Sequence, residues 1–166
     1  MEDYEEAPYL ELDNYKAPNG ANSVFIPMHD NKKIRLMYWN SNKSNQLGTV
    51  LLQQGHNEFI EKYYETIQEF LDRNYNVVAF DWRGQGMSER MINDKTKQYI
   101  KDFNIHNLDI ECIFNKVLKH FKKPLIGIGH SMGGFILLSA LKKNQIKFDK
   151  VILSAPMLGF RSEKLL

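Results

Sequence analysis

Short apolar runs alternate with longer amphipathic segments along this chain. Four runs have the length and composition of buried strands, at residues 49–53, 77–80, 125–128 and 151–155. Apolar residues at helical spacing follow three of these strands, at residues 59–71, 105–121 and 132–143. Strands that alternate with helices of this length are typical of right-handed β-α-β units. The pattern therefore predicts an α/β fold, a mainly parallel sheet with helices on both faces.

The first part of the chain follows a different pattern. Two β-rich runs, at residues 24–28 and 34–39, flank a polar turn and predict an N-terminal β-hairpin. Residues 1–22 contain two prolines and an Asn-Gly pair and have no apolar period, so we expect a flexible N-terminal arm. The predicted organisation is therefore an arm followed by one α/β domain over residues 23–166.

The composition agrees with a single globular domain. Of the 166 residues, 43% are apolar and 25% are charged, with a formal net charge of +2. The most apolar stretch, residues 132–141, is shorter than the ~18 residues that a membrane span needs. The first residues are acidic where a secretory signal is basic, and the single cysteine, Cys112, has no partner for an internal disulfide. We therefore expect a cytoplasmic protein.

The third apolar strand runs directly into the sequence Gly129-His130-Ser131-Met132-Gly133-Gly134 and then into a predicted helix. This is G-x-S-x-G in a strand, turn and helix context, the pattern of a nucleophile elbow. It predicts that the Ser131 hydroxyl stands clear of the sheet. The Met132 amide and the start of the helix would direct positive dipoles at a developing oxyanion. The alternative interpretation is an ordinary glycine-rich turn.

The glycine-rich segments do not fit nucleotide binding. Gly84 and Gly86 follow a predicted strand, but Glu89 stands where a dinucleotide loop needs its third glycine. Neither this segment nor the one at Gly129 has the Lys-Ser or Lys-Thr pair that completes a P-loop. The lysines are scattered as on solvated helix faces, which excludes a nucleic-acid groove. We expect no cofactor, no metal and no nucleic acid.

Four segments in chain order resemble the lysophospholipase branch of the α/β-hydrolase superfamily, which is similar to monoacylglycerol lipases and serine aminopeptidase-like hydrolases. These segments are residues 48–64, 80–88, 129–134 and 151–159. The resemblance implies the α/β-hydrolase fold, Ser131 as nucleophile, and an oxyanion hole formed by the backbone amides of His56 and Met132. It also implies that Asp81 braces the site through hydrogen bonds to nearby backbone. Gln54 departs from the family, in which many members have histidine at this position.

The resemblance leaves the catalytic triad incomplete. In this fold the nucleophile is followed by an acid and then by a histidine, and no histidine follows Ser131. The five histidines, which we interpret as solvated or core residues, are His29, His56, His106, His120 and His130. The chain therefore resembles the N-terminal half of a hydrolase, a partial domain truncated after its sixth strand.

The implied activity is that of a serine hydrolase of carboxylic esters, acting on a lipid-like substrate such as a lysophospholipid or a monoacylglycerol. One alternative is a catalytically inactive fragment of a split or truncated gene, for which a second polypeptide would supply the missing C-terminal half. Another is a peptidase of the same superfamily. A lipid-like substrate also leaves open a transient contact with a membrane surface.

Overall fold

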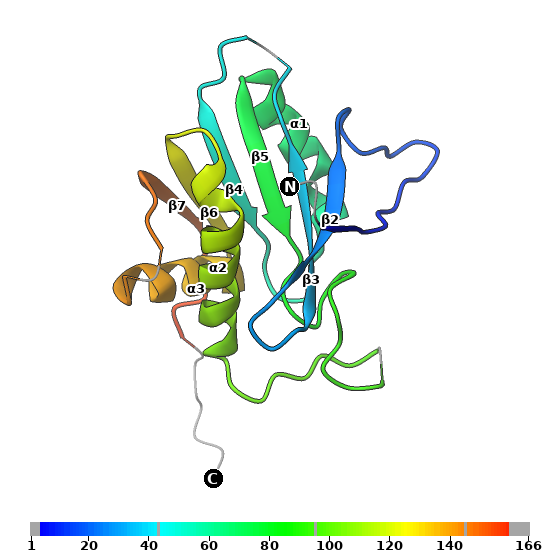
Figure 1. Ribbon diagram of the computed structural model, residues 1–166, viewed down its shortest axis with the longest axis vertical. Helices are drawn as coiled ribbons and strands as arrows, with labels where there is room; N and C mark the ends of the chain where they lie inside the picture. Colours follow the sequence, from blue (N-terminus) through cyan, green and yellow to red (C-terminus); the bar gives the residue numbers. More distant parts are fainter. Residues whose placement is uncertain (1–3, 43, 95, 145, 160–166) are drawn as a thin grey trace.

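The computed structural model describes residues 4–42, 44–94, 96–144 and 146–159 (Figure 1). Within these residues seven strands form one sheet, in the spatial order β1-β2-β3-β5-β4-β6-β7. The strands are β1 (Glu5–Glu6), β2 (Asn22–Pro27), β3 (Lys33–Trp39), β4 (Gly48–Gln53), β5 (Tyr75–Phe80), β6 (Leu125–His130) and β7 (Lys150–Ser154). The helices are the 3-10 turn η1 (Ile60–Tyr63), α1 (Tyr64–Asp72), α2 (Ile105–Lys116), the 3-10 turn η2 (Leu118–His120) and α3 (Met132–Lys142).

The sheet combines an antiparallel and a parallel part. The predicted hairpin is confirmed, because β2 and β3 pair antiparallel, and β3 joins this hairpin to β5. β5, β4, β6 and β7 are parallel to one another, as the alternation of strands and helices predicted. The sequence pattern missed β1, since two residues are too few to show a period.

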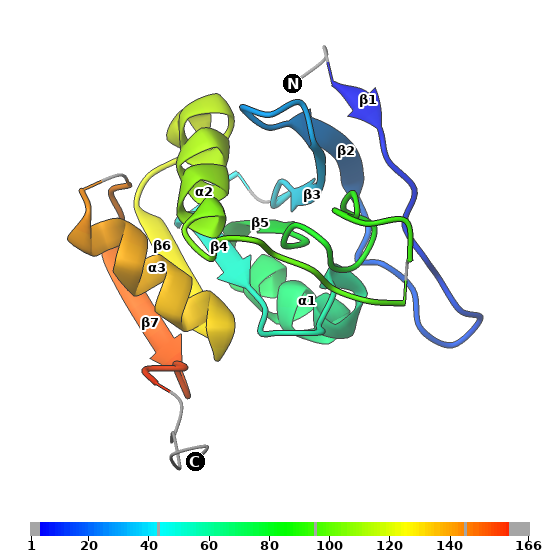
Figure 2. The same ribbon diagram turned by 90° about the horizontal axis from the view of Figure 1, so that it is seen from below.

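Helices cover both faces of the sheet (Figure 2). Val50 and Leu52 of β4 pack in a core with Tyr64 and Ile67 of η1-α1. Leu51, between them, belongs to the second core, which includes α2 and α3. This alternation follows from the two-residue period of a strand. All six residues of β4 are buried, which explains its continuous apolar pattern.

Two predicted helices are divided in the structure. The segment predicted as one helix from residue 59 begins with the 3-10 turn η1 before α1. The segment predicted to end at residue 121 leaves α-helical geometry at Val117, where φ is −128° and ψ is −64°. No helix in the part of the chain that the structure describes combines the length and apolarity of a membrane span.

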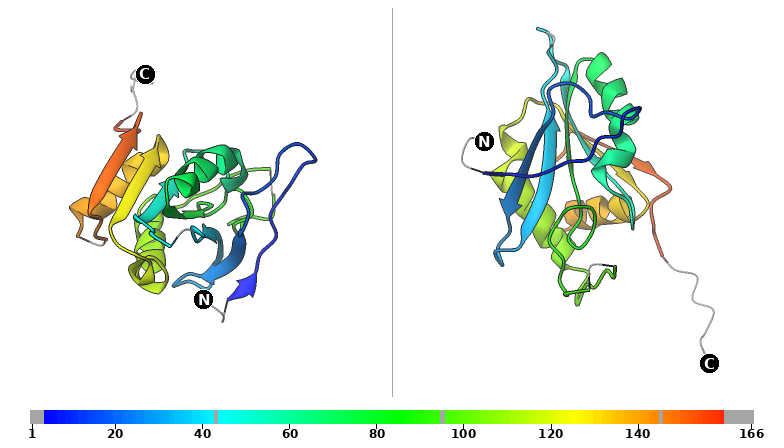
Figure 3. Two further views of the ribbon diagram at one scale, coloured as in Figure 1. Left: turned by 90° about the horizontal axis from the view of Figure 1, so that it is seen from above. Right: turned by 90° about the vertical axis from the view of Figure 1, so that its right-hand side faces the viewer.

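Residues 4–22 lie against the domain, and in Figure 3 this dark blue segment runs across the hairpin toward α1. Trp39 donates its indole N–H to the carbonyl of Pro18 at 3.0 Å, and Tyr64 donates its hydroxyl to the carbonyl of Leu10 at 3.1 Å. The ring of Tyr15 stacks on Tyr64 at 5.6 Å. These contacts determine where the segment lies, whereas its flexibility stays a prediction.

β7 forms one edge of the sheet. Among the described residues it pairs with β6 alone. Its side chains alternate between exposed and half-buried, and Ile152 is 54% exposed. Edge strands avoid pairing with other chains through charges and prolines. β7 has one such charge, the exposed Lys150 at its start, whereas residues 151–155 contain no charge and no proline. As far as the described residues show, this edge is therefore open to association.

We predict that the 166-residue chain self-associates through β7 and that Ile152→Lys increases the monomer fraction several-fold at tens of micromolar. A second charge in the middle of this edge strand, beside the exposed Lys150 at its start, opposes pairing with another copy of the strand. Leu47, which is 46% exposed outside the strands, provides the matched control, and Leu47→Lys should leave association unchanged. Light scattering measures the result. A clean 19.5 kDa monomer of the unsubstituted chain would contradict the prediction.

Candidate active site

Ser131 lies on the turn between β6 and α3, in the strand, turn and helix context that the sequence predicted. Its φ of 49° and ψ of −116° are unusual for a residue with a side chain, and such conformations cost about 1–3 kcal/mol. Three hydrogen bonds hold the turn. The Ser131 N–H donates to the carbonyl of Ser154 at 3.0 Å, and its carbonyl accepts from Phe135 at 3.2 Å and Met157 at 3.0 Å.

Two glycines allow the backbone of the turn to pack closely. A Cβ on Gly129 would lie 2.6 Å from the Cα of Gly134, inside any van der Waals contact. A Cβ on Gly133 would lie 2.6 Å from the carbonyl oxygen of Gln54. Gly133 is in the first turn of α3, whereas Gln54 follows the end of β4. The start of α3 is thus packed directly against the loop that leaves β4.

That loop passes beside the serine. A Cβ on Gly55 would lie 3.1 Å from the Cβ of Ser131, so His56 follows within one residue of this contact. Met132 is the first residue of α3. Among the described residues, the backbone N–H groups of His56 and Met132 have no hydrogen-bond acceptor. The structure brings both predicted oxyanion donors to the turn that carries Ser131, whereas their role stays a prediction.

Glu58 holds the loop in place. Its Oε2 accepts the Gly55 N–H at 2.7 Å and the Tyr63 hydroxyl at 2.6 Å, and its Oε1 pairs with Lys62 at 2.7 Å. Burial alone would raise the pKa of Glu58, but the bonds from Lys62, Tyr63 and the Gly55 amide outweigh it and lower the pKa to about 2. The loop therefore has a permanently charged anchor at neutral pH.

Asp81, directly after β5, provides the predicted bracing hydrogen bonds. Its buried Oδ1 accepts the Ile60 N–H at 3.0 Å and the Gln54 side-chain amide at 3.2 Å. Its Oδ2 accepts the Met87 N–H at 2.8 Å and the Arg35 Nε–H at 2.8 Å. One carboxylate thus joins β3, the loop after β4 and the loop after β5.

Arg35 lies between two buried carboxylates, Asp81 and Glu61. It donates to both Glu61 oxygens, at 2.5 and 2.7 Å. Burial raises the pKa of Asp81 to about 6, because one guanidinium does not neutralise two buried acids. Burial would also raise the pKa of Glu61, but hydrogen bonds from Arg35 outweigh it and hold the pKa below its usual range. Asp81 is therefore the member of this cluster that takes up a proton first.

A second ion cluster was not apparent in the sequence. Arg83 donates to both oxygens of Asp109 on α2, at 2.8 and 2.6 Å. It also donates to both oxygens of Asp30 in the hairpin turn, at 2.6 and 3.1 Å. Burial would lower the pKa of Arg83, but its hydrogen bonds to the carboxylates of Asp109 and Asp30 outweigh burial and raise the pKa. No local spacing links these three residues, so only the fold brings them together.

No histidine among the described residues hydrogen-bonds to Ser131. His106 is a core residue, 1% exposed, with its ring edge-on to Trp82 at 5.5 Å. Burial, Arg83 and His56 lower the pKa of His106 to about 4. His29, His56 and His120 are exposed, and His130 is half-buried beside Gly55. These positions agree with the interpretation of the histidines as solvated or core residues.

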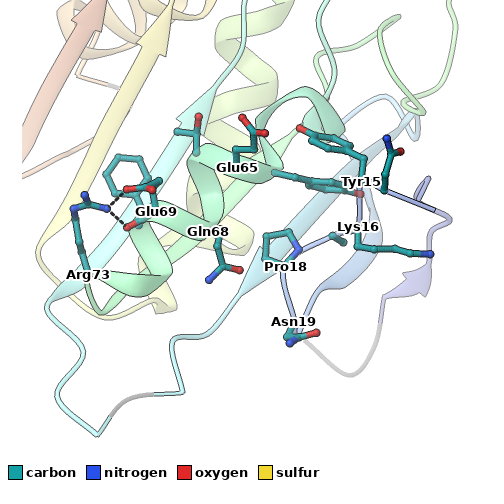
Figure 4. Close-up of a pocket in the computed structure, with 13 residues that line it drawn as sticks. Tyr15, Lys16, Pro18, Asn19, Glu65, Gln68, Glu69 and Arg73 are labelled. Carbon is teal, nitrogen blue, oxygen red and sulfur yellow. Dashed lines mark hydrogen bonds and ion pairs between the residues drawn. The ribbon is translucent and has the colours of Figure 1, made fainter. Parts of the chain in front are cut away.

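A cavity of about 1070 Å³ lies away from Ser131, between the N-terminal segment and α1 (Figure 4). Its described lining residues include no serine, histidine or cysteine, and its Arg73 pairs with Glu69. Another cavity, of about 410 Å³, is lined by Asn57 and Glu58 of the loop that passes Ser131. The loop that passes Ser131 therefore forms part of the wall of the smaller of these two cavities, whose described lining residues do not include Ser131, His56 or Met132.

We predict that Gly133→Ala lowers the free energy of unfolding by roughly 1–3 kcal/mol, because the added methyl group overlaps the carbonyl of Gln54. Gly159→Ala is the matched control. A Cβ at Gly159 would meet nothing within 4 Å, so this substitution should lower the free energy of unfolding by less than about 0.5 kcal/mol. Urea unfolding followed by circular dichroism measures both. Equal stability of the two variants would refute the close packing of α3 on this loop.

Comparisons with known proteins identify the family of this chain. Residues 44–165 match the family model described as "Serine aminopeptidase, S33". A probable lysophospholipase L2 of Haemophilus influenzae is 32% identical over 111 residues, which cover 66% of this chain and 35% of that protein. The monoglyceride lipase of Saccharomyces cerevisiae is 29% identical over 138 residues, which cover 80% of this chain and 42% of that protein.

Solved structures of hydrolases are similar to this chain in fold. A soluble variant of monoglyceride lipase from Saccharomyces cerevisiae matches with a TM-score of 0.62 and 26% identity, over 81% of this chain and 44% of that one. A carboxyl esterase from Bacillus coagulans matches with a TM-score of 0.63 and 18% identity, over 82% of this chain and 44% of that one. The chain spans less than half the length of each of these relatives. The predicted α/β-hydrolase fold is confirmed, and the chain belongs to the serine aminopeptidase S33 family of α/β hydrolases.

Proposed function

We propose that this chain carries the nucleophile and the oxyanion hole of a hydrolase that cleaves carboxylic esters of lysophospholipids or monoacylglycerols. The observation that carries the proposal is the strained backbone of Ser131, with φ 49°, on the turn between β6 and α3. Such strain clusters at functional sites. The similarity to a lysophospholipase and to a monoglyceride lipase supports a lipid ester as the substrate.

In the proposed reaction the Ser131 Oγ attacks the ester carbonyl carbon, and its proton passes to a histidine. The amides of His56 and Met132 donate hydrogen bonds to the oxyanion of the tetrahedral intermediate. The histidine then protonates the leaving alcohol as the ester C–O bond breaks, which leaves an acyl group on Ser131. Water, deprotonated by the same histidine, then attacks the acyl carbon. The bond between this carbon and Ser131 Oγ breaks, the histidine returns its proton to Oγ, and the fatty acid leaves.

We propose that the histidine and its acid lie on a C-terminal half outside these 166 residues, supplied by a second polypeptide or by a longer form of the chain. Two observations support this. None of the five histidines follows Ser131, and none hydrogen-bonds to it among the described residues. The chain also covers 35% and 42% of its lysophospholipase and monoglyceride lipase relatives. Residues 23–166 would then be the N-terminal part of the hydrolase domain, after an arm over 1–22.

Two alternatives have support of their own. Among the residues that the structure describes no histidine hydrogen-bonds to Ser131, which favours a catalytically inactive fragment when the chain is alone. The description of the matching family favours a peptidase on the same scaffold, since it names a serine aminopeptidase. A lipid substrate would also bring the chain into transient contact with a membrane surface. The single cysteine, Cys112, supports a reducing location such as the cytoplasm.

The nucleophile can be tested by co-expressing the chain with the C-terminal half of a related lysophospholipase that carries an acid and a histidine. We predict that a fluorophosphonate probe labels Ser131 in this complex and that Ser131→Ala abolishes labelling. The chain alone should hydrolyse p-nitrophenyl butyrate barely above buffer, because loss of the histidine costs about 10⁶ in turnover in serine hydrolases. Mass spectrometry of the labelled peptide identifies the residue.

Ser154→Ala is the control, since Ser154 lies at the end of β7 and contacts Ser131 through its backbone. This variant should label normally, and Ser131→Ala should melt within a few degrees of the unsubstituted chain. Labelling of Ser88 or Ser154 would contradict the assignment of the nucleophile. Ordinary ester turnover by the chain alone would contradict the proposal that the base lies elsewhere.

A further inference from the structure

The cavity of about 410 Å³ opens where two loops at the carboxyl ends of the strands meet. One wall is formed by residues 57–59, directly after the Gly55-His56 segment that passes Ser131. The opposite wall is formed by residues 84–87 and by the side chains of Arg90, Lys97 and Gln98. This first wall therefore continues the loop that carries the His56 amide, one of the two proposed oxyanion donors, whereas Ser131, His56 and Met132 are not among the described lining residues.

The acidic groups of this cavity are already paired. Glu58 is bound by Lys62, by the Tyr63 hydroxyl and by the amide of Gly55. Glu61 is bound through both oxygens by Arg35. Their charges are therefore balanced within the protein, and neither carboxylate is left to attract a cation from solution.

The two cationic side chains of the cavity, Arg90 and Lys97, have fewer and weaker partners within the protein than these carboxylates. Among the described residues, the Arg90 guanidinium makes one hydrogen bond, to the carbonyl of Ser88 at 3.2 Å, so most of its N–H donors are available. Lys97 pairs with Asp94 at 3.2 Å, and its side chain is 72% exposed. An exposed pair of this kind contributes little and is easily exchanged for another anion. Both side chains can therefore donate to an anionic ligand.

Two further features limit what the ligand is. The buried side-chain oxygen of Gln98 has no hydrogen-bond donor among the described residues, so it can accept one from a hydroxyl. Leu10, Phe59 and Met87 give the cavity apolar surface. A ligand that combines an anion, a hydroxyl and short aliphatic parts would satisfy all three kinds of group.

We propose that this cavity binds the glycerophosphate head group of a lysophospholipid. Arg90 and Lys97 bind the phosphate, and Gln98 accepts a hydrogen bond from the free hydroxyl of the glycerol. This assignment rests on the proposed function, because it assumes that the ester bond lies at Ser131. It selects a lysophospholipid over a monoacylglycerol, since a glycerol without phosphate offers no charge to the two cations.

Calorimetric titration of the 166-residue chain tests the proposal, with sn-glycerol 3-phosphate, glycerol and inorganic phosphate as probes. We expect glycerol 3-phosphate to bind most tightly. Arg90→Gln should weaken its binding by roughly tenfold or more, because it removes charge-assisted hydrogen bonds. Lys97→Gln, at a position too exposed to affect folding, should weaken it several-fold. Arg73→Gln, which removes an exposed arginine directly after α1, is the matched control and should bind as the unsubstituted chain does.

Three results would overturn the proposal. These are equal affinity for glycerol and glycerol 3-phosphate, inorganic phosphate bound as tightly as glycerol 3-phosphate, and binding unaffected by both Arg90→Gln and Lys97→Gln. The titration does not depend on chemistry at Ser131, so Ser131→Ala should bind the probe normally. Intact binding together with failed fluorophosphonate labelling would refute the proposed nucleophile alone. Successful labelling without binding would refute the head-group site alone.

Discussion

The carboxylate of Asp81 is the contact on which the loops of the candidate site depend. It is fully buried and accepts hydrogen bonds from Ile60, Met87, Gln54 and Arg35. These donors come from a strand and from two loops that are far apart in the chain. The loop after β4 then packs on α3 and passes beside the serine, so one buried acceptor group fixes the surroundings of the elbow.

The burial of Arg35, Glu61 and Asp81 removes charged side chains from water, which costs free energy of folding. The desolvation of a buried ion pair can equal its Coulombic gain, but the removal of one partner costs about 3–5 kcal/mol. The cluster around Arg35 therefore acts more through geometry than through net stability. It also reaches the N-terminal segment, since Arg35 donates to the carbonyl of Pro8 at 3.3 Å and Glu61 accepts the Leu10 N–H at 3.2 Å. The same ions that align the loops hold this segment against the domain.

The features that sequence reasoning predicted correctly are those with a local signal. The buried strand β4 shows as a continuous apolar run, and the turn at Ser131 shows as glycines at fixed spacing. The ion pair between Arg83 and Asp30 joins residues 53 positions apart, which no periodicity reveals. The contacts of residues 4–22 were missed for another reason, because most use backbone carbonyls that every sequence has. The cavity near Arg90 also depends on the folding of two separate loops.

Amide hydrogen exchange of Asp81→Asn tests most directly whether this carboxylate positions the site. The substitution keeps the size of the side chain but replaces an acceptor oxygen with an amide group, so it cannot satisfy all four donors. We expect faster exchange at residues 54–60 and 84–88, with unchanged rates in the middle of α2 and α3. Unchanged rates in both loops would contradict a positioning role for Asp81, as would a uniform increase across the whole domain.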